Sequence, residues 1–281
     1  MKNIKYLLQF LFVMFLFGIF KIIGLENSKY LSGNIMTLLG PMFRSKKIIF
    51  SNLSKAFPNL DDLEKEKILK KMWFNYGRIF AEYMFIKSFR NNTKKSQNIL
   101  IVNSKILKDI KSNSQPVIFI SGHFNNFELM AMEIERSGID LAAVYRPLNN
   151  KYLNPMMENI RKKYICKKQI KKGLSGTKEL LINFKRGTSI ALMIDQRVSQ
   201  GIRSNFFNEK ALTTTIPAQL VRKFNIPVVP IFIERINNTN FKIKVQNPIN
   251  FSKKSSVKDI TTKLNYVLEK GYESGEHFQK Y

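Results

Sequence analysis

Val117-Ile118-Phe119-Ile120-Ser121-Gly122-His123-Phe124-Asn125-Asn126-Phe127-Glu128 is the stretch of this chain that decides the fold. Its first four residues are apolar and rich in β-branched side chains, which predicts a buried strand, and Gly122 permits a sharp exit from it. Apolar and charged residues then mix until Ser137-Gly138, which predicts a helix that begins near Asn125 or Asn126 as its cap. A buried strand followed by such a helix indicates an α/β arrangement.

His123, one of two histidines in the chain, stands at the predicted end of this strand. Glu128 falls in the first turn of the predicted helix, so the two side chains can approach within hydrogen-bonding distance. A carboxylate placed there fixes the imidazole tautomer and stabilises its protonated form, as a general base requires. The same spacing arises by chance, and many strand-end histidines are only satisfied hydrogen-bond donors, so the pair needs support from its context.

Downstream, apolar runs alternate with helical patterns. Strands are predicted at residues 141–145, 189–194, 227–233 and 241–245, and helices at residues 152–164, 176–184 and 217–224. This alternation predicts an α/β fold, a single catalytic domain with a mostly parallel central sheet flanked by helices. Ligands bind such sheets outside the carboxyl ends of the strands, which selects His123, Arg146, Asp195 and Gln196 as candidate site residues.

The first residues of the chain predict a membrane anchor. From Tyr6 to Ile23, eighteen residues are broken only by Gln9, Gly18 and Lys21. As a helix they extend about 27 Å, just short of the roughly 30 Å hydrocarbon core of a bilayer. Because no small-residue cleavage site follows, we expect an uncleaved anchor over residues 1–25, ahead of a catalytic domain over residues 26–281. A true span and a shallow interfacial insertion both remain open.

Two further helices are predicted after the anchor. Residues 43–57 have an apolar and a basic face, which suits either anionic lipid or packing on the protein itself. Asp61 with Glu64 resembles a capping box, and the apolar and aromatic stripe from Ile68 to Tyr83 that follows is expected in the core.

The composition limits the partners and the chemistry. A net charge of +27 suits an anionic partner such as nucleic acid, a phospholipid surface, a phosphorylated lipid or an acidic carrier protein. The sequence shows none of the recognition patterns of nucleic-acid binders, so no nucleic acid is expected, and a membrane-anchored basic binding protein is the non-enzyme alternative. The lone Cys166 excludes an internal disulfide framework and Cys-based zinc patterns, and we expect neither metal nor cofactor. The basic body and single cysteine favour the cytoplasmic side of the membrane.

The sequence resembles a known family through an ordered series of blocks. Residues 121–128 resemble the His-x4-Asp/Glu block of the glycerolipid acyltransferase superfamily, in the Glu form typical of bacterial lipid A biosynthesis lauroyl/myristoyl acyltransferases. Similar blocks follow the family's order at residues 52–58 (upstream of the first), 144–150, 194–196, 206–207 with 213–217, and 227–230. The resemblance covers nearly the whole chain. Family members usually continue with an aromatic, His- and Arg-rich tail after a segment like residues 275–281, where this sequence ends.

The resemblance implies an O-acyltransferase at the cytoplasmic face of the bacterial inner membrane. It would move a fatty acyl chain from acyl carrier protein to a hydroxyl of a Kdo-bearing lipid A precursor, with His123 and Glu128 as the catalytic pair. The two partners are then acyl carrier protein and an anionic lipid acceptor.

The remaining candidate residues follow from the same resemblance. Arg146 and Arg161 are candidates for the anionic groups of the substrates. Asp195 is expected to position a substrate with Gln196 or to brace Arg161, and a structural ion pair is the alternative. Cys166 has no paired histidine, which disfavours a nucleophilic role. Another phospholipid or a phosphoinositide mannoside is the alternative acceptor.

Overall fold

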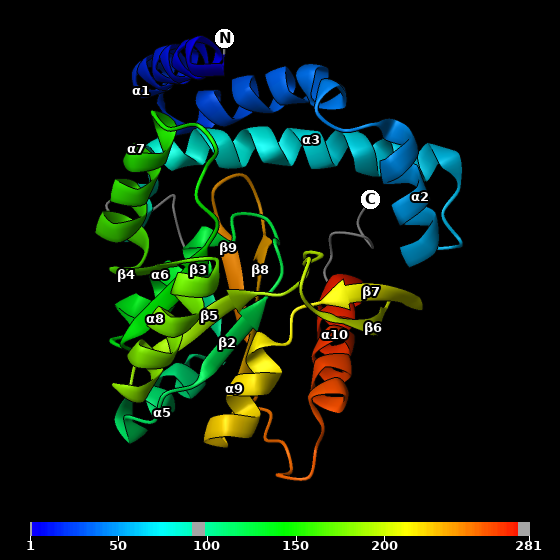
Figure 1. Cartoon of the computed structure of the whole chain (residues 1–281). Helices are drawn as coiled ribbons and strands as arrows, with labels where there is room; N and C mark the ends of the chain where they lie inside the picture. Colours follow the sequence, from blue (N-terminus) through cyan, green and yellow to red (C-terminus); the bar gives the residue numbers. More distant parts are fainter. Residues whose placement is uncertain (1, 92–98, 275–281) are drawn as a thin grey trace. The chain divides into compact units, whose positions relative to one another are not determined.

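The computed structural model describes residues 2–91 and 99–274 (Figure 1). Contacts divide these residues into two compact units. The first comprises residues 2–91 with residues 150–152, and the second comprises residues 99–149 with residues 153–274. Residues 275–281, which resemble the segment that precedes the C-terminal tail of family members, lie outside the described residues.

The first unit is helical in its described residues. Its elements are α1 (Lys2–Leu39), a 3-10 turn (Gly40–Met42), α2 (Lys46–Ala56), α3 (Asp62–Met84) and α4 (Ile86–Asn91). Gly24 kinks α1 with φ of 78°, a value that glycine adopts without steric cost. The capping box predicted at the start of α3 is confirmed, because the Asp61 carboxylate accepts from Glu64 N and Asp61 N donates to Glu64 Oε2.

Helices α1 and α3 approach each other closely beyond the kink. Ser32 Oγ donates to the carbonyl oxygen of Gly77 at 2.7 Å, and a Cβ on Gly77 would lie 2.1 Å from the Ser32 carbonyl oxygen. Within the predicted core stripe of α3, Trp73 is buried whereas Tyr76 is half exposed. Among the described residues, Lys2–Met42 is the one helical stretch long and apolar enough to cross a membrane.

The second unit is built on a seven-stranded sheet. Its strands are β1 (Ile99–Val102), β2 (Ile118–Ser121), β3 (Leu141–Tyr145), β4 (Lys168–Lys171), β5 (Ser189–Met193), β8 (Val228–Arg235) and β9 (Phe241–Val245). They lie in the order β1-β9-β8-β2-β5-β3-β4, and all neighbouring pairs are parallel except β8 with β9. The predicted mostly parallel sheet is therefore confirmed. Strands β6 (Ile202–Phe206) and β7 (Glu209–Thr213) form a separate antiparallel hairpin.

Helices pack on this sheet, as predicted. The helices in contact with it are α5 (Ser104–Asn113), α6 (Glu128–Arg136), α8 (Leu174–Lys185) and α10 (Val257–Ser274). The same unit contains α9 (Ile216–Phe224), which contacts α10, and α7 (Leu153–Ile160), which a π-helical turn over Arg161–Ile165 follows directly. The central strand β2 is buried at every position, which explains its unbroken apolar sequence. Figure 1 shows α10 beside the β6–β7 hairpin, and these elements are in contact.

Helix α6 begins later than the sequence predicts. Its first residue is Glu128 and its N-cap is Phe127, which provides no side-chain cap, whereas Asn125 or Asn126 was the predicted cap. Asn125 has a left-handed backbone with φ of 39°, a conformation that asparagine tolerates better than most residues. The chain therefore turns once more between β2 and α6, and Glu128 becomes the first residue of the helix.

Candidate functional site

The parallel pairing of β2 with β5 brings His123 next to Asp195. Ser121 and Met193 are the last paired residues of these neighbouring strands. His123 and Asp195 each lie two residues beyond that pair, so they stand side by side at the carboxyl edge of the sheet. This edge is where open parallel sheets place their ligand sites.

Asp195 holds His123 through two hydrogen bonds. The backbone N–H of His123 donates to Oδ2 at 2.8 Å, and Nδ1 of the ring lies 2.7 Å from Oδ1. Burial raises the pKa of Asp195, but hydrogen bonds from His123 and Tyr272 outweigh that effect, so the pKa lies below its usual value. Because a carboxylate only accepts, the imidazole proton resides on Nδ1 and the lone pair on Nε2. The pair therefore has the geometry of a general base with its orienting carboxylate.

Nε2 of His123 points away from this carboxylate. The amide nitrogen of Gln196, which is exposed, lies 3.3 Å from Nε2. The ring of Phe127 packs edge-on against the imidazole, with 4.7 Å between the ring centroids. The imidazole side chain is 30% exposed and the Asp195 side chain 8%, so the nitrogen that can accept a proton is on the accessible side of the pair.

Glu128 pairs with Arg161. Both Nε and a terminal nitrogen of Arg161 donate to Glu128 Oε1, at 2.9 and 2.6 Å. The two side chains are 9% and 13% exposed. Glu128 also begins α6, where the helix dipole favours a negative charge. The pair thus fixes a guanidinium in a nearly buried position.

The two carboxylates have exchanged the partners expected from the sequence. Glu128 was predicted to orient His123, and Asp195 was considered as a brace for Arg161, whereas the structure pairs Asp195 with His123 and Glu128 with Arg161. The physical reason is the register of β2 and β5, which places Asp195, 72 residues further along the chain, beside the imidazole.

Arg161 is placed by a change of helix type. It starts the π-helical turn, in which Cys166 N donates to the Arg161 carbonyl oxygen, a spacing of five residues. Such turns are rare and are frequently found at functional sites. The guanidinium carbon lies 5.4 Å from the centroid of the Tyr145 ring, and Tyr145 Oη donates to Glu158 at 2.6 Å. Burial, followed by this hydrogen bond, raises the pKa of Tyr145, so the phenol stays protonated beneath the guanidinium.

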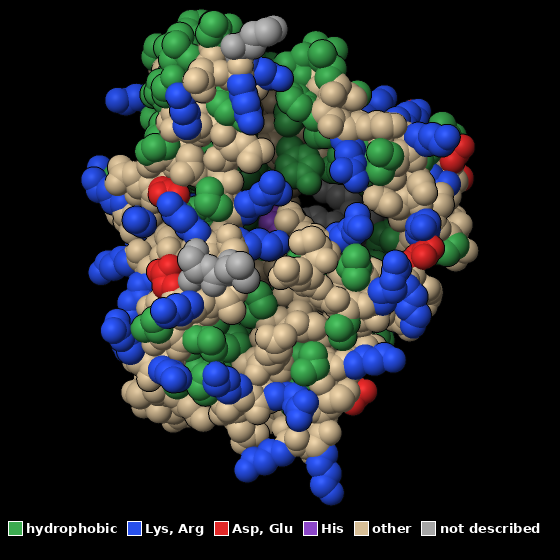
Figure 2. Space-filling model, viewed as in Figure 1, with side chains coloured by type: hydrophobic (Ala, Val, Ile, Leu, Met, Phe, Trp, Pro, Cys, Tyr) green, Lys and Arg blue, Asp and Glu red, His purple; other side chains and the backbone are tan. Residues whose placement is uncertain are grey.

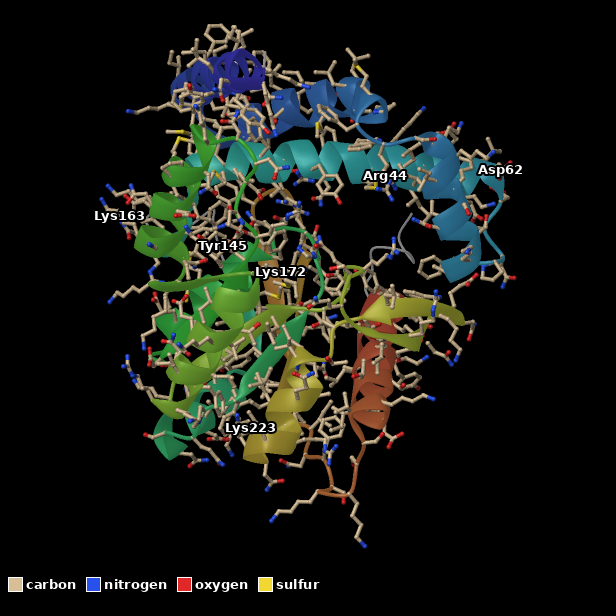
Figure 3. The ribbon with its side chains drawn as sticks, in the orientation of Figure 1. Arg44, Asp62, Tyr145, Lys163, Lys172 and Lys223 are labelled. Carbon is tan, nitrogen blue, oxygen red and sulfur yellow. The ribbon has the colours of Figure 1, made fainter. Side chains whose placement is uncertain are left out.

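Arg146 follows Tyr145 at the end of β3 and is exposed. Figure 3 labels Tyr145 and, close to it, Lys172, whose backbone N–H donates to the Tyr145 carbonyl oxygen at 2.8 Å. Lys and Arg side chains are scattered over the face seen in Figure 2, where Asp and Glu are few. This face therefore shows the basic character expected from the net charge.

Tyr272 of α10 completes the support of Asp195 and was not predicted from the sequence. Its hydroxyl donates to Asp195 Oδ2 at 3.1 Å, and its ring lies 4.3 Å from that of Phe124. A Cβ on Gly122 would lie 2.9 Å from the Phe124 ring and 3.2 Å from Asp195 Oδ2. Gly122 is therefore required by this close approach, in addition to the sharp exit that the sequence indicates. No motif links residues 77 positions apart, so the sequence carried no signal for Tyr272.

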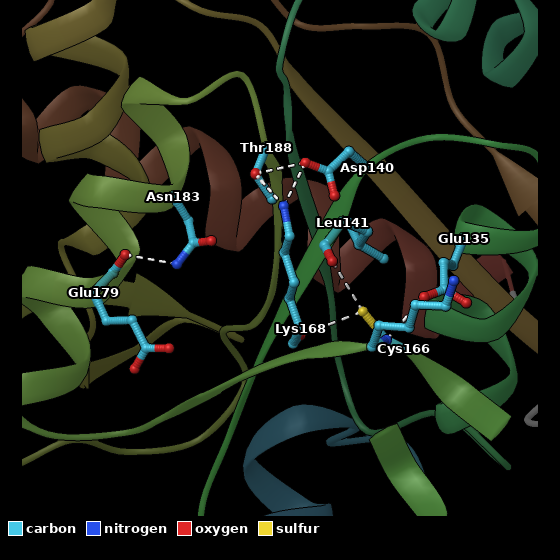
Figure 4. A network of polar contacts seen from close by, with 9 residues as sticks. Glu135, Asp140, Leu141, Cys166, Lys168, Glu179, Asn183 and Thr188 are labelled. Carbon is cyan, nitrogen blue, oxygen red and sulfur yellow. Dashed lines mark hydrogen bonds and ion pairs between the residues drawn. The ribbon is translucent and has the colours of Figure 1, made fainter. Parts of the chain in front are cut away.

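Cys166 belongs to a buried structural network. Its thiol donates to the Leu141 carbonyl oxygen at 3.1 Å, and burial raises its pKa to about 12 (Figure 4). Beside it, Lys168 Nζ donates to Asp140 and to Thr188. A thiol in this environment is a poor nucleophile, in agreement with the sequence.

Comparisons with known proteins identify the family of this chain. A family model described as bacterial lipid A biosynthesis acyltransferase matches residues 1–274. Lipid A biosynthesis acyltransferase 2 of Shigella flexneri is 26% identical over 113 residues, which make up 40% of this chain and 36% of that protein. The match to this relative thus spans about a third of its length. The chain belongs to the family of bacterial lipid A biosynthesis acyltransferases.

Proposed function

We propose that this protein transfers a fatty acyl chain from acyl carrier protein to a hydroxyl of a Kdo-bearing lipid A precursor, at the cytoplasmic face of the bacterial inner membrane. The observation that carries the proposal is the hydrogen bond of 2.7 Å between His123 Nδ1 and Asp195 at the carboxyl edge of the sheet, in a chain of this family. This pair supplies a base without metal or cofactor.

In the proposed reaction, Nε2 of His123 removes the proton from the acceptor hydroxyl as its oxygen attacks the thioester carbonyl carbon. A carbon–oxygen bond forms and the carbon–sulfur bond breaks. The imidazolium then returns its proton to the departing thiolate, so that no acyl-enzyme is needed. Asp195 stabilises the imidazolium while it exists, since the negative charge lies 2.7 Å from Nδ1. The amide of Gln196 marks the position that the acceptor hydroxyl would take.

The basic side chains near the site support anionic substrates. Arg146 is exposed at the end of β3, and Arg161 is held by Glu128. We assign Arg146 to a phosphate or carboxylate of the acceptor and Arg161 to the positioning of that subsite, with Glu128 acting through Arg161. The other basic residues would attract acyl carrier protein, which is acidic.

A product-mass experiment tests the proposal. The enzyme in lipid vesicles is incubated with several acyl carrier protein thioesters and a tetra-acylated lipid A precursor, in parallel with lysophospholipid and phosphoinositide-mannoside acceptors. We expect one added acyl chain on the lipid A precursor, none with His123→Ala, and normal turnover with Lys223→Ala, an exposed residue of α9 that serves as the control. Unchanged melting of His123→Ala shows that its fold is intact. Full turnover by this variant, or acylation of the other acceptors alone, would refute the proposal.

A further inference from the structure

The first half of α1 has one face that is apolar and open. Six large side chains of residues 4–22 are each more than half exposed: Ile4, Leu8, Leu11, Phe12, Phe15 and Ile22. Figure 2 shows hydrophobic side chains gathered over α1 at the top of the view. A patch of this size on one helix marks a surface that binds a partner or a membrane.

The opposite face of the same half-helix is covered by its own unit. Phe17 and Phe20 are buried against Phe80 of α3, with ring centroids 5.2 and 6.1 Å apart. Asn150 Nδ2 donates to the Tyr6 carbonyl oxygen at 2.9 Å and lies 3.2 Å from Gln9 Oε1. Gln9, one of the interruptions of the apolar run, is exposed but contacts Asn150 of its own unit.

The lysines stand at the borders between these two faces. Ile4 and Ile22 are eighteen residues apart, five full turns of a helix that rotates about 100° per residue, so they mark one line along the open face. Lys5 then lies about 100° to one side of that line and Lys21 about 100° to the other. Both are exposed, and their stems can carry the ammonium groups toward lipid phosphates.

We propose that α1 up to Gly24 lies in the plane of an anionic phospholipid surface, with its open face in the headgroup–acyl boundary, instead of crossing the bilayer. This half-helix has a side covered by its own unit, an open apolar side and a lysine on each border. Such a helix can bury its open side in the headgroup–acyl boundary while its other side stays against protein. Beyond the kink the helix returns to protein, since Ser28, Lys29 and Ser32 are buried.

Charge favours lipid over a second copy of this chain on the open face. Two copies meeting there would bring the same lysine borders together, and like charges oppose such contact. An anionic bilayer instead places phosphates opposite each lysine, at about 1 kcal/mol per residue near the surface.

Nitroxide depth measurements test the proposal. A label is attached in turn at Leu8→Cys, Phe15→Cys and Ile22→Cys, which are seven residues apart on the open face, in vesicles of phosphatidylglycerol and phosphatidylethanolamine. The chain without an added cysteine is the background control, because Cys166 is buried. The ratio of each label's accessibility to oxygen and to a nickel chelate gives its depth in the bilayer. This measurement does not depend on acyl transfer.

An in-plane helix predicts the same shallow depth at all three positions, and loss of vesicle binding by on the order of 100-fold when Lys2, Lys5 and Lys21 are all replaced by Gln. A crossing helix predicts depths that differ by about 10 Å between successive labels, which would overturn the proposal. Water-exposed labels, or spin–spin broadening between copies, would overturn it as well.

Discussion

The Asp195→Asn variant tests whether Asp195 is the carboxylate that orients the imidazole of His123. Asn has nearly the same shape but no charge, so it removes the negative group 2.7 Å from His123 Nδ1. A hydrogen bond to a charged group contributes about 1.5–3 kcal/mol, and each 1.4 kcal/mol is about tenfold in rate, so losing it costs roughly 10- to 150-fold. An Asn amide can also donate to Nδ1 and favour the wrong tautomer, a defect that in Ser-His-Asp triads lowers kcat by about 10⁴.

We therefore expect Asp195→Asn to lower kcat by at least about 100-fold, measured by product mass against time under saturating thioester. Tyr272→Phe, which keeps the ring and removes only the hydroxyl bound to Asp195, should show a smaller loss. An Asp195→Asn enzyme within threefold of the parent across the pH range would refute the assignment.

Three further results are expected. Glu128→Gln and Arg161→Gln should each lower the unfolding free energy by about 3–5 kcal/mol, since each removes the charge opposite a nearly buried partner. The double variant should lose little more stability than either single variant. Additive losses of stability in thermal melts would contradict this expectation. Gly77→Ala should destabilise by about 1–3 kcal/mol because its Cβ would meet the Ser32 carbonyl, while Gly18→Ala, with open space around it, should not. Cys166 should resist a thiol reagent until the chain is unfolded, and rapid labelling of the native protein would show that its burial is incomplete.

Much of the sheet could be predicted from local patterns. Strands β3 and β9 have the predicted bounds, because β3 is an apolar run and β9 alternates buried apolar residues with lysines. β1, β4 and the β6–β7 hairpin were not predicted: β4 reads Lys-Gln-Ile-Lys, with a single buried side chain, so hydrophobicity gives it no signal. Its place at the edge of the sheet accounts for that sequence.

The candidate residues of the site were found, but not their pairing. His123 and Asp195 stand out as polar residues at the ends of predicted strands, whereas Arg161 became a candidate through the family resemblance. Which carboxylate meets which cation depends on the strand order, and no local pattern encodes that β5 lies beside β2. From the sequence alone, Glu128, five residues after His123, is the expected partner of the imidazole. In the structure Asp195 takes that place.

The pairing of His123 with Asp195 also makes the site a late product of folding. Its two halves are 72 residues apart and meet only after β2 and β5 have aligned. A slip of one residue in that alignment would turn the side chains of β5 to the opposite face and carry Asp195 away from the imidazole. Parallel pairing over long sequence separations forms slowly. Recovered activity during refolding therefore reports the completed central sheet, since collapsed intermediates with a misaligned β5 lack the carboxylate that orients His123.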